Sequence, residues 1–312
     1  MKPELLVTPH SVQEIPALIE AGADAFILGE KRFALRLAGD FPLDELKKAL
    51  EVIKGAGKKA YVAINAVLAN EMLEDLRAYL QTLKDLPVDG LRFSDPGALM
   101  LAREEGIQIP LHWSSETMGT NFFTANYWLD RGASRVVLAP EIMKDAVLET
   151  AAQAKGEIEV LVHGAVCMFH SRRLLLGNYM TFQGMSYEKV HDNGMFSLYD
   201  PERQLYYPIF EDQQGTHIFN GSDVCMIDDL ADLVDGGISS IRIDGAIKDP
   251  EYLRFVIAGY RLALDLCQED RKKYLAASRA LFKKMEEVQP ENRKLDRGFF
   301  YKPSIYKNES KK

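Results

Sequence analysis

The fold is decided by the stretch Arg131-Gly132-Ala133-Ser134-Arg135-Val136-Val137-Leu138-Ala139-Pro140-Glu141, in which a glycine turn leads into a short apolar run. A nearly continuous apolar run of this length is typical of a strand that is buried on both faces, as in a parallel sheet. The same kind of junction, from a helical pattern through glycine into an apolar run, recurs at 21–25 and at 235–239. The repeated junction indicates a chain of alternating helices and parallel strands.

Eight short apolar or β-branched runs are spaced along the chain, and we predict strands at 4–8, 25–28, 60–65, 90–94, 111–114, 135–139, 158–163 and 240–244. Amphipathic patterns between them predict helices at 11–21, 42–56, 71–83, 95–105, 121–130 and 142–154. Eight such units in 312 residues predict one α/β domain, a (β/α)8 TIM-like barrel over residues 1–270.

The alternation breaks after the seventh strand. Residues 177–221 are rich in Tyr, Gly, Asp and Gln and contain three short runs, 196–198, 205–209 and 216–219, that predict antiparallel strands. We expect this insertion to lie over the barrel mouth, where long loops are often functional. Two long helices are predicted at 250–267 and 269–287. Residues 271–312 then form a C-terminal helix followed by a basic, aromatic tail.

Composition bounds the class of protein. The chain is 47% hydrophobic and 27% charged, as expected for a soluble globular protein, and no apolar run is long enough for a membrane span or a signal peptide. Three widely spaced cysteines favour the reducing cytoplasm over a disulfide framework. The net charge of −8 disfavours a nucleic-acid-coating protein, although residues 271–312 hold 13 Lys and Arg against five Asp and Glu. That basic segment is either a phosphate-contacting element or a solvated helix face.

The active site of such a barrel lies at the carboxyl ends of its strands. Polar side chains at those ends are therefore the candidate catalytic residues: Glu30, Asn65, Glu116, His163, Cys167 and Asp244. Carboxylates from separate strands that converge on one cavity are expected to perturb each other's pKa. The alternative is that several of them bond backbone amides or pair with Lys31, Arg32 and Lys248.

Standard catalytic motifs are absent: there is no G-x-S-x-G, H-E-x-x-H, P-loop or G-x-G-x-x-G sequence. His163, Cys167 and His170 have loosely ligand-like spacing, but a zinc site would need a distant fourth ligand. Cys167 and His163 are also candidates for a thiolate–imidazole pair. The plainer interpretation is a buried cysteine and a histidine that hydrogen-bonds its loop.

The segment 161–180 contains His163-Gly164-Ala165-Val166-Cys167, then Ser171-Arg172-Arg173-Leu174, then Asn178-Tyr179-Met180. This order resembles the H-G-A-x-C, S-G-R-C and N-Y-M signature of peptidase family U32. Further blocks over about residues 4–265 are similar to that family: Ser94-Asp95-Pro96-Gly97, 135–141, 215–226 and Ile243-Asp244-Gly245-Ala246-Ile247-Lys248.

The departures from the family pattern concern its iron–sulfur cluster, which relatives hold through four cysteines. Cys167 matches the first cysteine and Cys225 the last, whereas Leu174 stands at the second and there is no cysteine from 168 to 224. Two thiolates are too few for the usual cluster, so we expect no metal and no cluster in this chain. The family's final arginine is also replaced, by Ala246.

Short, cluster-less members of this kind resemble one of a pair of bacterial proteins implicated in 5-hydroxylation of the wobble uridine of tRNA, with prephenate as the proposed oxygen source. The paralogue in that pair keeps the cysteines. The resemblance thus implies tRNA, prephenate and that paralogue as partners. The predicted substrate-binding residues are Arg36, Arg172, Arg173, Asn178, Tyr179 and Lys248, since guanidinium forks match carboxylates. Tail residues predicted to contact RNA are Phe299, Phe300, Tyr301, Lys302, Tyr306 and Lys307. The alternatives are a collagenase-like peptidase with Cys167 as nucleophile and a non-catalytic subunit.

Overall fold

The computed structural model describes residues 2–185, 196–290 and 292–302. Its centre is a closed barrel of eight parallel strands, because β11 pairs in parallel with β1 on one side and with β7 on the other. The barrel strands are β1 (Glu4–Val7), β2 (Ala25–Leu28), β3 (Lys59–Ile64), β4 (Gly90–Phe93), β5 (Leu111–Trp113), β6 (Ala133–Val137), β7 (Glu157–Ser171) and β11 (Ser240–Ile243). The predicted TIM-like barrel is confirmed.

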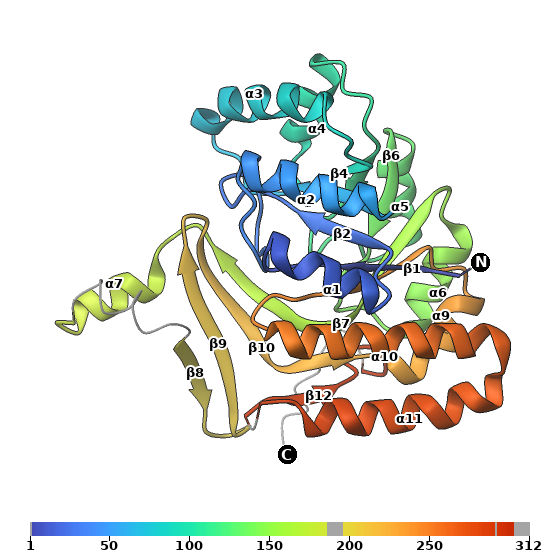
Figure 1. The fold of residues 1–312 in the computed structure, drawn as a ribbon. Coiled ribbons are helices and arrows are strands. Elements are labelled where there is room, and N and C mark those ends of the chain that lie inside the picture. The colour runs from blue at the N-terminus through green and yellow to red at the C-terminus, as the bar shows by residue number, and fades with distance from the viewer. Residues whose placement is uncertain (1, 186–195, 291, 303–312) are drawn as a thin grey trace.

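Helices form an outer layer around these strands (Figure 1). They are α1 (Ile15–Glu20), α2 (Leu43–Gly55), α3 (Leu73–Lys84), α4 (Pro96–Glu104), α5 (Phe122–Leu129), α6 (Lys144–Gln153), α9 (Leu230–Asp235), α10 (Pro250–Glu269) and α11 (Arg271–Glu287). Side-chain oxygens cap four of them: Asp95 accepts from Gly97 N at α4, Asn121 from Thr124 N at α5, Asp249 from Glu251 N at α10, and Asp270 from Lys272 N at α11.

An arm extends from the barrel after the seventh strand. It consists of β7 beyond Gly164, α7 (Leu175–Phe182), β8 (Phe196–Asp200), β9 (Leu205–Asp212) and β10 (Gly215–Cys225), joined antiparallel in the order β7-β10-β9-β8. Figure 1 shows α7 and β8 projecting away from the barrel. The turn between β9 and β10 returns to it, because Gln214 Nε2 donates to the carbonyls of Lys31 (2.9 Å) and Arg32 (2.8 Å).

The described part of the C-terminal segment packs against the barrel. Strand β12 (Lys294–Asp296) pairs in parallel with β10, Phe300 is buried, and the Tyr301 hydroxyl donates to Asp229. The expectation that Phe300 contacts RNA is therefore wrong, because its ring is enclosed by the protein itself. Tyr306 and Lys307 lie outside the described residues. None of the helices in the described ranges is long and apolar enough to cross a membrane.

Candidate functional site

A cavity opens at the carboxyl ends of the barrel strands and encloses about 560 Å³, including its opening to solvent. We call it the inner cavity. Its lining comes from strands β2, β3, β4, β7, β10 and β11 and from the loops that follow β1, β2, β3, β5, β6 and β11: Thr8, Ile27, Leu35, Arg36, Leu37, Ala63, Asn65, Arg92, Glu116, Pro140, Leu161, Ala165, Val166, Cys167, Phe219, Arg242, Asp244 and Ala246. Four of the six predicted catalytic residues are brought together here, namely Asn65, Glu116, Cys167 and Asp244.

An arginine–glutamate pair crosses the mouth of the inner cavity. Arg36 Nη2 lies 3.0 Å from Glu116 Oε1, yet this nitrogen is buried and has no hydrogen-bond partner among the described residues. Both residues have left-handed backbones, with φ of 52° at Arg36 and 67° at Glu116. Such conformations cost free energy for non-glycine residues and cluster at functional sites. Burial alone would raise the pKa of Glu116, but Arg36, Arg242 and Arg92 outweigh it and lower that pKa to about 2.

Two more arginines reach the floor of the cavity from the barrel interior. Arg92 on β4 and Arg242 on β11 both contact Glu159 on β7, at 2.6 and 3.3 Å. Arg242 also forms an ion pair with Asp244. The side chain of Glu159 is fully buried. Three guanidinium groups, counting Arg36, therefore converge on one cavity.

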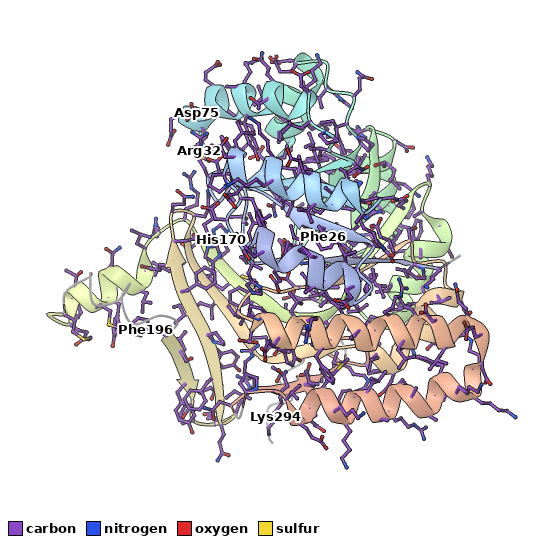
Figure 2. The ribbon with its side chains drawn as sticks, viewed as in Figure 1. Phe26, Arg32, Asp75, His170, Phe196 and Lys294 are labelled. Atoms are coloured by element: carbon purple, nitrogen blue, oxygen red, sulfur yellow. The ribbon has the colours of Figure 1, made fainter. Side chains whose placement is uncertain are left out.

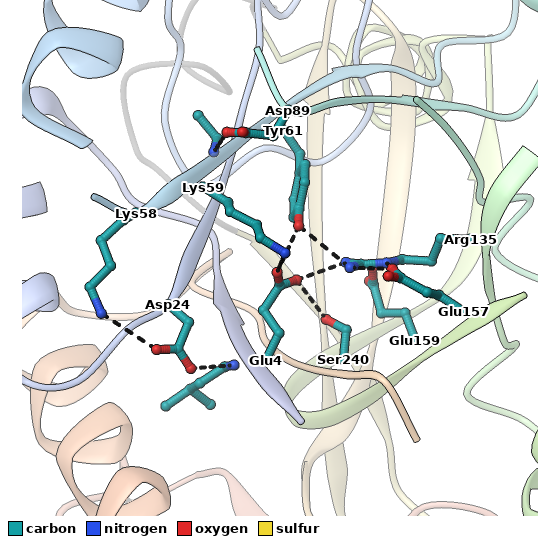
Figure 3. A network of polar contacts seen from close by, with 12 residues as sticks. Glu4, Asp24, Lys58, Lys59, Tyr61, Asp89, Arg135, Glu157, Glu159 and Ser240 are labelled. Carbon is teal, nitrogen blue, oxygen red and sulfur yellow. Dashed lines mark hydrogen bonds and ion pairs between the residues drawn. The ribbon is translucent and has the colours of Figure 1, made fainter. Parts of the chain in front are cut away.

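The charged network continues to the opposite end of the barrel (Figure 3). Arg135 on β6 lies 3.7 Å from Glu159 and 2.8 Å from Glu4 on β1. Tyr61 and Ser240 donate to the same Glu4 carboxylate, at 2.7 and 3.2 Å. The barrel interior thus holds a column of alternating charges that ends at the cavity floor.

Asn65 and Asp244 hold the loops that form the cavity. Asn65 Oδ1 accepts a hydrogen bond from Leu35 N (3.1 Å), which fixes the backbone next to Arg36. Asp244 Oδ1 accepts from the hydroxyl of Thr8 (3.2 Å) and from Ala246 N (2.9 Å). The sequence left open whether the polar residues at the mouth act in catalysis or bond backbone amides. Asn65 and Asp244 make bonds of the second kind.

Cys167 lies in the cavity without the features of an activated nucleophile. Burial raises the pKa of its thiol, and Arg36 acts in the opposite direction without reversing the shift. Its sulfur donates to the carbonyl of Phe169 at 3.3 Å, and no described imidazole bonds to it. A nucleophilic cysteine needs a lowered pKa or an adjacent base, so the geometry does not favour peptidase chemistry at this thiol.

His163 and Lys248 lie outside the inner cavity, on the side of β7 and β11 that faces α10. A β-bulge between β7 and β11 separates the pairs Leu161–Arg242 and His163–Ile243, so Leu161 lines the cavity whereas His163 does not. His163 Nε2 bonds the hydroxyl of Tyr252 (2.9 Å), and burial lowers the pKa of the imidazole to about 3. Lys248 pairs with the buried Asp223. Both residues therefore make polar contacts inside the fold and do not line the cavity.

The remaining candidates lie at the rim or on the arm. Glu30 pairs with Arg32 at 3.2 Å and does not line the cavity. Arg172, Arg173, Asn178 and Tyr179 are exposed on and before α7. The sequence placed them near the mouth because they follow β7. The strand, however, continues to Ser171 and carries them outward.

The two cysteines that match cluster ligands of the family are not brought together. Cys225 pairs in register with His163, so about four residues, or roughly 13 Å of extended strand, separate its level on the sheet from that of Cys167. The Cys225 thiol is buried beside the Tyr260 hydroxyl (3.7 Å) and does not line the cavity.

Gly164 allows the close approach of β7 to Asp244, and its substitution gives a test of the site. Its φ is 121°, and a Cβ there would lie 2.7 Å from the carbonyl oxygen of Asp244. We expect Gly164→Ala to lower the free energy of unfolding by more than about 1 kcal/mol. Gly57→Ala is the control, because Gly57 also has a positive φ but faces open space. Equal losses in urea unfolding of the two variants would show that the contact with Asp244 is unimportant.

The closed barrel, with polar side chains gathered at the carboxyl ends of its strands, defines a TIM-barrel protein with its site in the usual place. The chain belongs to a particular group of them, peptidase family U32, whose profile matches residues 10–310. It is 50% identical to the tRNA hydroxylation protein P2 of Bacillus subtilis (strain 168) over 98% of this chain and 99% of that protein. It is 27% identical to the tRNA hydroxylation protein P1 of the same organism, over 88% of this chain and 66% of that one.

A solved structure of dihydrodipicolinate synthase is similar in fold, with a TM-score of 0.52 and 11% identity over 93% of this chain and 85% of that chain. At this level of identity the similarity shows the TIM-barrel fold alone. Family membership rests on the sequence, and the roles of individual cavity residues rest on their geometry.

Proposed function

We propose that this protein takes part in the 5-hydroxylation of the wobble uridine of tRNA and that its inner cavity holds the dicarboxylate co-substrate, prephenate. The observation that carries the proposal is the 50% identity to tRNA hydroxylation protein P2 over nearly the whole of both chains. The matched length includes the barrel, the arm and the C-terminal segment, so the proposal concerns the whole molecule.

The charges of the inner cavity support a small dianion as its ligand. Arg36, Arg92 and Arg242 come from three different strands or loops and present guanidinium groups to one space. A guanidinium binds a carboxylate through two parallel hydrogen bonds, which favours arginine over lysine where a planar carboxylate is recognised. Arg36 Nη2 lies 3.0 Å from Glu116 Oε1 but makes no hydrogen bond among the described residues, so it can donate to such a ligand beside Glu116.

We further infer that this chain holds no iron–sulfur cluster of its own and acts in the cytoplasm beside a cluster-bearing paralogue. Leu174 in place of a cysteine and the separation of Cys167 from Cys225 support the first part. The second is supported by the presence of both a P1 and a P2 relative in one organism. Iron analysis of the purified chain, alone and after co-purification with the paralogue, tests this inference. We expect iron only when the paralogue is present.

The test is the level of hydroxylated wobble uridine in bulk tRNA, measured by mass spectrometry after deletion of the gene. We expect the modification to fall to background in a strain without a redundant hydroxylation gene, and the wild-type gene to restore it. Unchanged modification would refute the role in hydroxylation. If the gene for Arg242→Met restored the modification fully, the inner cavity would not be needed for hydroxylation. The protein would then act as a non-catalytic subunit.

A further inference from the structure

A second hollow adjoins the inner cavity on its solvent side and opens over about 680 Å³, including open solvent. We call it the outer hollow. It shares Leu35, Arg36, Asn65, Glu116 and Cys167 with the inner cavity and is otherwise lined by Val67, Ser94, Ser115, Thr117, Met168, Phe169 and His170. The two spaces form one mouth. Its inner part is rich in arginine, and its outer part is lined by apolar and hydroxyl-bearing side chains.

The outer hollow has one apolar wall. Met168 and Phe169 project from β7 with 46% and 44% of their surface exposed, and Val67, after β3, is 43% exposed. Large apolar side chains that gather at the entrance of a polar cavity mark a binding surface more often than solitary exposed residues do. The opposite side is polar, with the hydroxyls of Ser94, Ser115 and Thr117 and the amide of Asn65.

The strand segment that carries the apolar wall is tied to its neighbours. Phe169 lies in register with Ile218 on β10, and the neighbouring His170 stacks on His217 with ring centroids 4.7 Å apart. His170 Nε2 bonds the carbonyl of Gln214, whose side chain is tied to the loop after β2. Figure 2 labels His170 at the base of the arm, beside the barrel. The strand that carries Met168 and Phe169 is therefore anchored to β10 and, through Gln214, to the loop after β2.

We propose that the outer hollow is the subsite for the target base, a pyrimidine nucleotide extruded from the anticodon loop. An aromatic ring at the mouth offers a stacking surface for the face of a base, while hydroxyl and amide groups opposite can read its edge. The base would then lie against the inner cavity, across Arg36 and Glu116. This inference rests on the proposed function, because only a role in tRNA hydroxylation brings a base to this mouth.

Two exposed arginines follow the end of β7, outside the outer hollow. Arg172 and Arg173 follow the apolar wall, and neither forms an ion pair with another residue of the described ranges. Side chains of this kind contact backbone phosphates and position a nucleic acid without reading its sequence. We therefore assign these two arginines, which were predicted from the sequence to bind the dicarboxylate, to contacts with the RNA backbone.

The binding test uses an anticodon stem-loop RNA with uridine at the wobble position and the same RNA with an abasic site there. By fluorescence anisotropy, with the chain alone and mixed with its paralogue, we expect wild type to bind the uridine RNA at least about 5-fold more tightly. Phe169→Ala should abolish this preference and Phe169→Trp should keep it. Phe182→Ala, at an 85% exposed phenylalanine on α7 outside the hollow, is the matched control and should behave as wild type.

Two results would overturn the inference: equal affinity of wild type for the two RNAs in both conditions, or an undiminished preference in Phe169→Ala. The cellular assay separates this failure from that of the proposed function. If gene deletion leaves the modification unchanged, the function is wrong. If deletion removes it and Phe169→Ala restores it as fully as wild type, only the base subsite is wrong.

Discussion

Replacement of Arg36 by methionine is expected to weaken the binding of prephenate by about 10- to 100-fold, because hydrogen bonds to charged groups contribute about 1.5–3 kcal/mol each. Arg36 is the residue whose guanidinium is buried, faces the cavity and keeps an unbonded Nη2. Its loss also leaves Glu116 without the nearest cation, so the carboxylate would repel a dianion. Both effects act in the same direction.

Isothermal titration calorimetry with prephenate measures this affinity directly. Arg36→Lys keeps the positive charge but not the planar fork, and should fall between wild type and Arg36→Met. Arg279→Met is the matched control, since Arg279 is exposed on α11 outside the cavity. An Arg36→Met variant that is folded by circular dichroism and binds prephenate as wild type does would exclude the inner cavity as the dicarboxylate site.

The barrel could be predicted from the sequence because its signal is local and repeated. Each strand is a short apolar run, and junctions such as 131–135 place a glycine between helix and strand. Seven of the eight barrel strands agree with the structure to within two residues at each end, as at β6 (Ala133–Val137) against the predicted 135–139, whereas β7 continues eight residues past the predicted 163. The periodicity of apolar residues and the glycines between helices and strands are enough to predict the order of the barrel's strands and helices.

The direction of a side chain at the mouth could be predicted less well, because it depends on strand register. One bulge turns His163 away from the cavity, and nothing in the local sequence marks it except the glycine that follows. Lys248 and Cys225 likewise follow the right strands but face α10 or the C-terminal segment. The position of a residue after a strand therefore predicts its height along the barrel axis. It does not predict whether the side chain faces the cavity or the surrounding helices.

The charged barrel interior was missed altogether, although a signal was present. Arg92 and Arg242 are each flanked by apolar residues within predicted strands, and Arg135 begins the predicted strand 135–139. An arginine in the middle of a buried strand needs a carboxylate from another strand, and Glu159 is the interior candidate. Searching buried runs for charges of opposite sign would have found the cavity floor.

Replacement of Glu159 by glutamine is expected to lower the free energy of unfolding by about 3–5 kcal/mol, because it leaves Arg92 buried without a carboxylate and Arg242 with Asp244 alone. Glu157→Gln, two residues earlier on β7, is the matched control. Glu157 pairs with Arg135 at 2.7 Å, but half of its side chain is exposed, so its loss should cost no more than about 1 kcal/mol. Urea unfolding at neutral pH measures both variants.

The acid dependence of stability gives the same prediction an independent check. Burial alone would raise the pKa of Glu159, but Arg92, Arg242 and Arg135 hold it below the usual value. A carboxyl with a lowered pKa stabilises the fold above its unfolded-state pKa of about 4.3, and that contribution is lost as the pH falls further. The stability gap between wild type and Glu159→Gln should therefore be full at pH 7 and narrow below about pH 4. A gap that is absent at neutral pH, or that widens in acid, would show that Glu159 does not hold the arginines of the cavity floor.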